Sequence, residues 1–99
     1  MSRAGVTPET YRAAVKRALW KCEKCGDWHW LELHHILGRI PAVMVNEPDN
    51  LVLLCKGCHE WMHQSKTRAL SWVEATFGSE RLDRLQELRR GAKRVLRLP

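Results

Sequence analysis

The sequence predicts an α+β fold, in which a small ββα unit is held by a metal site and flanked by N- and C-terminal helices. Three observations lead to this prediction. Two Cys-x-x-Cys pairs enclose a segment with two short apolar stretches. Helical patterns of apolar residues lie before the first pair and after the second. A chain of 99 residues supports one domain with a modest core, so we expect a single domain over residues 1–99.

The first expected helix covers about residues 8–20. Thr7 can cap it, and Pro8 suits its first position. Tyr11 and Val15 then lie on one helical face. The opposite face is basic, with Arg12, Lys16 and Arg17.

The ββα unit follows. Apolar and polar residues alternate over 29–36, which predicts a strand. Glycine, proline and an Asp-Asn pair interrupt residues 38–50, which predicts a loop, and the apolar run 51–54 predicts a short buried strand. A helix should start near 56–58 and carry two histidines, four positions apart, on one face.

Two further helices are expected beyond this unit. Ser65 can cap the first, which Gly78 would end, and Ser79 can cap the second. The last part of the second helix is basic, with Arg89, Arg90, Lys93, Arg94 and Arg97. Such a run is most often a solvated helix face, but with the rest of this chain we favour a surface that contacts successive phosphates of a nucleic-acid backbone.

The composition favours an anionic partner. The formal net charge is +6, for which nucleic acid is the first candidate and an anionic membrane the second, although a small soluble protein can simply be basic. Residues 1–20 are basic without an uninterrupted apolar run, so no secretory signal is expected. No segment approaches the roughly 20 apolar residues of a membrane span. We therefore expect a cytosolic protein with no membrane partner.

The four cysteines predict a Cys₄ structural zinc site. In a reducing cytosol, two short pairs are typical of metal ligands rather than of disulfides. In a domain this small, the metal would supply folding free energy that the core alone lacks. The predicted ligands are Cys22, Cys25, Cys55 and Cys58.

The histidines form a second set of candidate ligands, because four cysteines complete a zinc site without them. Hydrolysis of a phosphodiester needs an activated water, neutralisation of charge on the phosphoryl oxygens, and help for the departing alkoxide. A divalent ion can serve the last two as a Lewis acid. A histidine off the metal can serve the first, since its ordinary pKa of about 6.5 leaves it largely neutral at physiological pH.

The cysteines and histidines also form one longer motif. Its parts are Cys-x-x-Cys, Leu33-His34-His35-Ile36, Asp49-Asn50-Leu51, and Leu54-Cys55-x-x-Cys58-His59 with His63. This motif resembles the HNH endonucleases, the ββα-metal or His-Me finger nucleases, and more narrowly the small cysteine-bearing HNH proteins of bacteriophages. The resemblance covers about residues 20–64. The basic helical extension, about residues 65–99, lies outside it.

The resemblance implies a ββα-metal core and a role for each motif residue. His35 becomes the general base, and His34, His59 and His63 become ligands of a catalytic divalent cation, with His59 counted among the catalytic residues. Asn50 would tie the 38–50 loop to backbone near His35 and so orient its imidazole. By itself, Asn50 would be read as a turn residue, and Asn46 is the weaker alternative for its role.

One geometrical conflict follows. In an ideal strand, His34 and His35 point to opposite faces. For both to reach one site, the strand must end or bulge there. Gly38 and Pro41, just downstream, favour an early end.

Some residues near the motif allow two interpretations. Arg39 can contact the scissile-strand phosphate or be a solvated loop residue. The tryptophans at 28, 30 and 61 flank the ligand motifs, and we favour packing around a small metal core over stacking on bases. The predicted DNA contacts are Arg39, Arg90, Lys93, Arg94 and Arg97.

We therefore expect a metal-dependent HNH endonuclease in the cytoplasm of a bacterial host cell, which cuts or nicks DNA in phage DNA processing or packaging. The resemblance implies 3′-hydroxyl and 5′-phosphate ends, and a partner in the phage terminase large subunit. The rival interpretation is a non-catalytic zinc module that binds nucleic acid or protein, and an RNA nuclease is a third. Imidazole ligands suit manganese, nickel, cobalt or zinc better than magnesium, but cellular abundance can outweigh this preference, so the ion stays open among the five.

Overall fold

A two-stranded antiparallel sheet lies at the centre of the molecule. The structure is a computed structural model that describes residues 5–96. Its strands are β1 (Leu31–His35) and β2 (Leu51–Cys55). The helices are α1 (Pro8–Arg17), the 3₁₀ turns η1 (Ala42–Met44) and η2 (Pro48–Asn50), and α2 (Lys56–Gln64), α3 (Lys66–Phe77) and α4 (Ser79–Leu96). The predicted α+β class is confirmed for the described residues.

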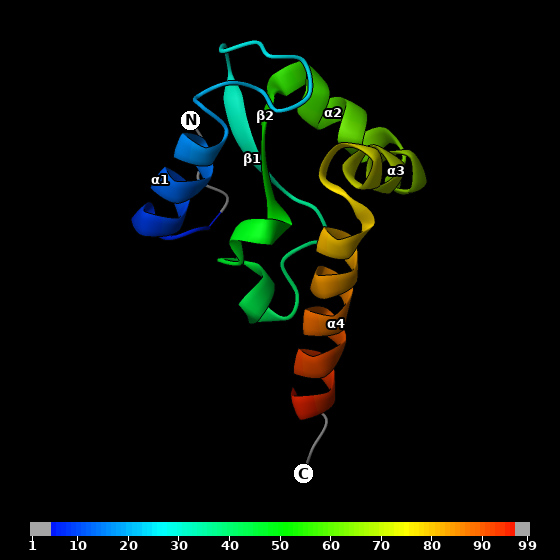
Figure 1. The fold of residues 1–99 in the computed structure, drawn as a ribbon. Coiled ribbons are helices and arrows are strands. Elements are labelled where there is room, and N and C mark those ends of the chain that lie inside the picture. Colours follow the sequence, from blue (N-terminus) through cyan, green and yellow to red (C-terminus); the bar gives the residue numbers. More distant parts are fainter. Residues whose placement is uncertain (1–4, 97–99) are drawn as a thin grey trace.

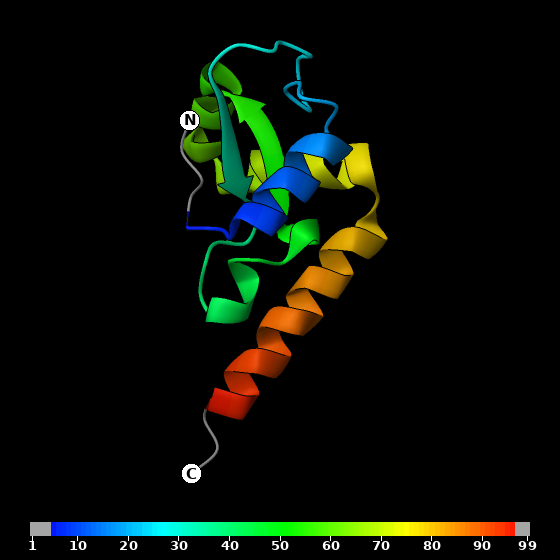
Figure 2. The same ribbon diagram turned by 90° about the vertical axis from the view of Figure 1, so that its left-hand side faces the viewer.

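The helices cover the sheet on both sides. In Figure 1, α1 lies on one side of the strands, and α2 and α3 lie on the other. Figure 2 gives the same arrangement from the side of α1. Because both faces of β2 are covered, its residues form one apolar run, and Leu51 to Leu54 are fully buried. Helix α4 extends from the end of α3 alongside η1 and η2 (Figure 1).

The helix ends follow the caps seen in the sequence. Thr7 Oγ1 accepts a hydrogen bond from Thr10 N at the start of α1. Ser65 does the same for Arg68 N at the start of α3, which ends at Gly78 with φ 94°. These local rules predicted the ends of α3 correctly.

Two elements are shorter than the sequence predicted. Helix α1 ends at Arg17 rather than near residue 20, because Leu19 and Trp20 have φ of 58° and 59° and leave the helical path. Strand β1 begins at Leu31 rather than at residue 29, because Trp30 has φ of 52°. Within residues 5–96, no helix is both long enough and apolar enough to cross a membrane.

An arginine pair holds the beginning of β2. Arg81 of α4 is buried and donates to the carbonyls of Asp49, at 2.8 Å, and Leu51, at 3.0 Å. Arg17 of α1 donates to Pro48 O, at 2.8 Å, and also to Leu51 O. Burial, followed by the charge of Arg17, lowers the pKa of Arg81. Two helices far apart in sequence therefore converge on η2 and the first residue of β2.

We predict that Arg81→Met lowers the free energy of unfolding by about 2–4 kcal/mol, because Asp49 O loses a charged donor in a buried place. Urea unfolding checks this. Arg84→Met is the matched control, since Arg84 is exposed and donates to the partly exposed Asp49 carboxylate, at 3.3 Å. It should cost less than about 1 kcal/mol. Equal effects of the two changes would contradict a special role for Arg81.

Candidate active site

The four cysteines lie together beside the start of β1 and the end of β2. Their sulfur atoms all lie within 4.8 Å of one another, and the Cys25 and Cys55 Sγ atoms are 3.6 Å apart. A tetrahedral ion with metal–sulfur bonds of about 2.3 Å would place its sulfurs about 3.8 Å apart. All four are free thiols. The cluster is therefore compatible with a structural metal site such as zinc.

The turn that carries Cys22 and Cys25 is docked on the outer edge of β2. Glu23 N donates to Leu53 O, and the Glu23 carboxylate accepts from Leu53 N, both at 2.8 Å. Gly26, with φ 82°, lets the chain turn back toward β1. Glu23 was not singled out from the sequence, and it is the residue that brings the first pair of cysteines to the second.

The cysteines differ in acidity. Burial raises the pKa of the Cys22 thiol, but hydrogen bonds from the backbone N–H groups of Cys25, Cys55 and Lys24 outweigh this and lower it to about 7. Burial, together with hydrogen bonds among the thiols, raises the pKa of Cys58. Since a metal ligand must be a thiolate, Cys22 is prepared for ligation, and binding would release protons from the others.

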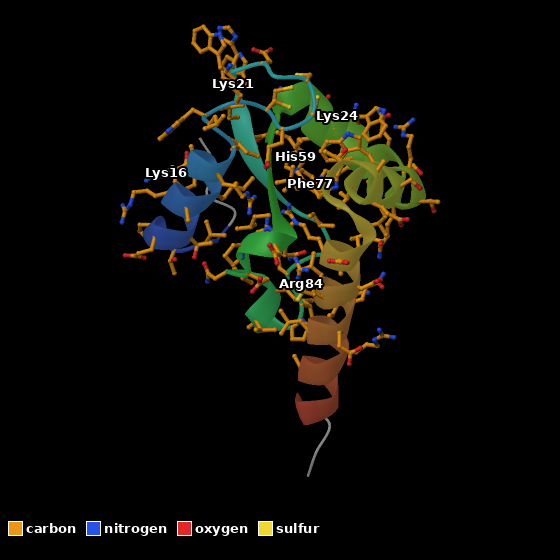
Figure 3. The ribbon with its side chains drawn as sticks, in the orientation of Figure 1. Lys16, Lys21, Lys24, His59, Phe77 and Arg84 are labelled. Atoms are coloured by element: carbon orange, nitrogen blue, oxygen red, sulfur yellow. The ribbon has the colours of Figure 1, made fainter. Side chains whose placement is uncertain are left out.

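Three histidines form a second cluster. His34 comes from β1, and His59 and His63 come from α2, where Figure 3 places His59 between the sheet and the helices. The nearest nitrogens of these three rings lie within 4.8 Å of one another, and Nε2 of His59 and Nε2 of His63 are 3.0 Å apart. Burial, and then the charges of the other histidines, lowers the pKa of His34 to about 3. His34 is therefore neutral, which is the form that binds a metal.

Glu32 orients one of these rings. Its Oε1 lies 3.2 Å from Nδ1 of His59. A carboxylate can only accept, so Nδ1 carries a proton, and Nε2, which faces His63, is the nitrogen available to ligate a metal. Glu32 was not singled out from the sequence. Its signal was the alternation of the strand, which puts Glu32 on the same face as His34.

His35 has a different environment. Its Nε2 lies 3.0 Å from Val45 O, and because a carbonyl only accepts, Nε2 carries the proton and Nδ1 keeps a lone pair. Burial lowers the pKa of His35, against the opposite effect of the Val45 hydrogen bond, and the charge of Arg39 lowers it further. The ring is therefore a neutral base that does not share the cluster of His34, His59 and His63.

The strand ends early enough for His34 and His35 to reach one place. Strand β1 stops at His35, and the chain turns through Gly38, with φ 82°. Both rings line a cavity of about 240 Å³ together with His63. Lys66, at the start of α3, lines it too and was not singled out from the sequence. The cavity thus combines two candidate ligands, a neutral base and a cation.

Asn50 is fully buried behind this cavity. Its Oδ1 accepts from Leu37 N at 2.8 Å, and its Nδ2 donates to Gly38 O and Met44 O, both at 2.9 Å. These hydrogen bonds tie η2 to the segment that follows His35. Asn46, the weaker alternative, instead accepts from Thr7 N at 2.8 Å, on an exposed side of the molecule.

The predicted DNA contacts are only partly described. Arg39 is exposed, and so is Arg90, which pairs with Glu87 at 3.2 Å. Of Lys93 and Arg94 the structure describes the backbone in α4 and not the side chains, and Arg97 lies outside the described residues. Their contacts with DNA stay predictions.

The prediction that the tryptophans pack around the metal core is wrong for two of the three. The exposed fractions of Trp28 and Trp30 are 67% and 81%. Of these three, Trp61 alone packs against the core, with the charged groups of Lys24 and Arg68 over its ring at 4.2 and 4.3 Å from the centroid. The φ of 52° at Trp30 turns that residue out of the strand, which a sequence pattern does not reveal.

Comparisons of this chain with protein-family models, curated proteins and solved structures find no match. The function is therefore inferred from the residues of the chain and their geometry.

We predict that a strong chelator lowers the Tm of the wild-type protein by about 10 °C or more, because metal binding at four thiolates contributes directly to folding. Thermal unfolding with and without chelator measures this. The Tm of Cys58→Ser should be lower than that of the wild type without chelator, and the chelator should change it little. His63→Ala is the control and should keep the full response. An undiminished response in Cys58→Ser would contradict a stabilising metal at the cysteines.

Proposed function

We propose that this chain is a metal-dependent endonuclease of the HNH type, with a ββα-metal core, that hydrolyses phosphodiester bonds in DNA. One observation carries the proposal. The neutral base His35 lines one cavity with His34 and His63, two members of the three-histidine cluster. A module that only binds nucleic acid has no need of such a base beside candidate ligands. The zinc at the four cysteines is proposed as structural, because four thiolates complete its coordination.

The three-histidine cluster fits a divalent cation. A separation of 3.0 Å between the Nε2 atoms of His59 and His63 matches two ligands about 2.0–2.2 Å from one ion. The Glu32 carboxylate fixes the His59 ring in the form that ligates. Imidazole ligands favour manganese, nickel, cobalt or zinc over magnesium. When bound, the cation would neutralise charge on the phosphoryl oxygens and on the departing oxygen.

The residues of the chain would divide the remaining work. Nδ1 of His35 takes a proton from a water molecule while the water oxygen forms a bond to phosphorus. The bond from phosphorus to O3′ breaks, and the released oxygen takes a proton from solvent, which leaves a 3′-hydroxyl and a 5′-phosphate. Lys66 lines the same cavity and would hold a phosphate of the substrate. Asn50 acts as a positioning residue, because it anchors the segment after His35.

Charge supports DNA as the substrate. The net charge of +6 and the exposed Arg39 and Arg90 suit a polyanion. The local resemblance to phage HNH proteins extends the proposal to phage DNA processing or packaging, with the terminase large subunit as a partner.

We predict that His35→Ala retains fold and DNA binding but loses cleavage of supercoiled plasmid by about 10²–10⁴-fold, because the proton acceptor is gone. Cleavage is measured at saturating DNA across a series of divalent ions. His29→Ala is the matched control, since His29 is an exposed histidine outside the cavity, bonded to Asp27 at 2.9 Å. It should turn over like wild type. If His35→Ala cuts at the wild-type rate, or the wild type binds without cutting in every ion, the proposal fails.

His59 and Glu32 should differ in their effect on metal binding, because His59 is the proposed ligand and Glu32 orients it. His59→Ala should abolish binding of added manganese or nickel, measured by calorimetry on protein whose cysteine metal is retained. Glu32→Gln should weaken that binding about 10–100-fold, because the ring loses its charged acceptor. Glu60→Gln changes an exposed glutamate of α2, the helix that carries His59, and should not alter metal binding. Wild-type affinity in Glu32→Gln would show that Glu32 does not orient His59.

A further inference from the structure

An apolar groove of about 730 Å³ lies beside the cysteine cluster and is separate from the cavity of His35. Its lining includes the side chains of Trp20, Trp28 and Trp30. These three tryptophans are 56%, 67% and 81% exposed, and the groove is hereafter called the tryptophan groove. A small protein rarely leaves several large aromatic rings together in water, so this surface points to a ligand.

Backbone strain at the groove supports this. Trp20 and Trp30 have φ of 59° and 52°, and the neighbouring Leu19 has φ of 58°. Bulky residues rarely adopt this left-handed region, because Cβ crowds the following carbonyl. The side chains gain little burial in return, since Leu19 is 74% exposed. Unfavourable conformations of this kind persist mainly at binding sites.

The charge of the groove distinguishes between ligands. Lys21 and Lys56 line it, and Figure 3 shows Lys21 at the end of the molecule where β1 begins. One carboxylate, that of Glu32, also lines the groove, but it is turned to His59 at 3.2 Å. Aromatic rings with lysines beside them are the surface that single-stranded nucleic acid requires, with bases on the rings and phosphates near the ammonium groups.

We propose that the tryptophan groove binds unpaired nucleotides of a DNA strand. Bases stack on Trp20 and Trp30 and on one face of Trp28, whose other face is covered by His29 with ring centroids 4.0 Å apart. Phosphates lie near Lys21 and Lys56. Stacking on a ring tolerates every base, so binding depends little on sequence.

The groove also meets the candidate active site. The side chain of Glu32 lines the groove, and its carboxylate also contacts His59. Unpaired nucleotides in the groove would therefore lead to the histidine cluster. This step alone rests on the proposed nuclease function, and it names the substrate class as DNA that carries a single-stranded stretch next to the cleaved bond.

The test measures binding apart from cleavage. The probe is fluorescein-labelled oligothymidylate of about 12 nucleotides, with a duplex of the same length and an oligouridylate as comparisons, titrated without added divalent ion. We expect the wild type to bind the thymidylate more tightly than the duplex and to show quenched tryptophan fluorescence, a sign of stacking. His35→Ala should bind equally well. Failure of plasmid cleavage would leave this result intact, so the two proposals fail separately.

The decisive variant replaces Trp20 and Trp30 together by glycine, which tolerates their positive φ. We expect at least a 10-fold loss of thymidylate affinity, with a Tm equal to that of the wild type or higher. Val43→Ala, a change at an exposed apolar residue outside the groove, is the control and should bind normally. Three results would overturn the proposal: unchanged thymidylate affinity in the double variant, equal affinity of the wild type for the duplex, or tighter binding of oligouridylate. Unchanged affinity in the double variant would indicate that the groove binds a partner other than nucleic acid.

Discussion

The register in which β1 pairs with β2 decides where His34 and Cys55 lie relative to the other candidate ligands. Leu31 pairs with Cys55, and His34 pairs with Val52. The first pairing places the start of β1 beside Cys55, and the second places His34 on the face that meets the histidines of α2. A slip by one residue would reverse the faces of the strand, so His34 would leave the histidine cluster. The apolar run of β2, buried on both sides, makes such a slip costly.

Helix α2 joins the two clusters in a single element. Cys58 belongs to the cysteine cluster, and His59, the next residue, belongs to the histidine cluster, so α2 fixes the separation of these two residues. The remaining support comes from the far end of the sheet. Asn50 holds the segment after His35, and Arg17 and Arg81 hold the carbonyls around Asn50. A cavity held from both ends keeps His35 and the neighbouring histidines in one geometry, which the proposed catalysis requires.

Two exposed surfaces extend from this core with different chemistry. The tryptophan groove offers aromatic rings and two lysines, and the cavity of His35 offers a neutral base and Lys66. Glu32 stands between them, on the sheet face that carries His34. In the two proposals taken together, the first surface binds unpaired nucleotides and the second acts on the bond beside them. Binding affinity and bond cleavage would then depend on different residues, because the energy of base stacking is the same before and after the phosphodiester bond is cleaved.

The sequence by itself determined the features that depend on near neighbours in the chain. Caps at Ser65 and Gly78 defined α3, alternation and apolar runs defined the strands, and the paired cysteines predicted their own cluster, which is confirmed. The roles of His35 and Asn50 were implied by the resemblance to HNH endonucleases and stay predictions. Tertiary structure alone decided the partners of Glu32 and Arg81 and the place of Lys66 at the cavity, because the groups they meet lie on other elements. The alternation of β1 indicates only the face on which Glu32 lies. It alone also decided that Trp28 and Trp30 face water, since a positive φ at a tryptophan is imposed by the surrounding chain and not by its own preference.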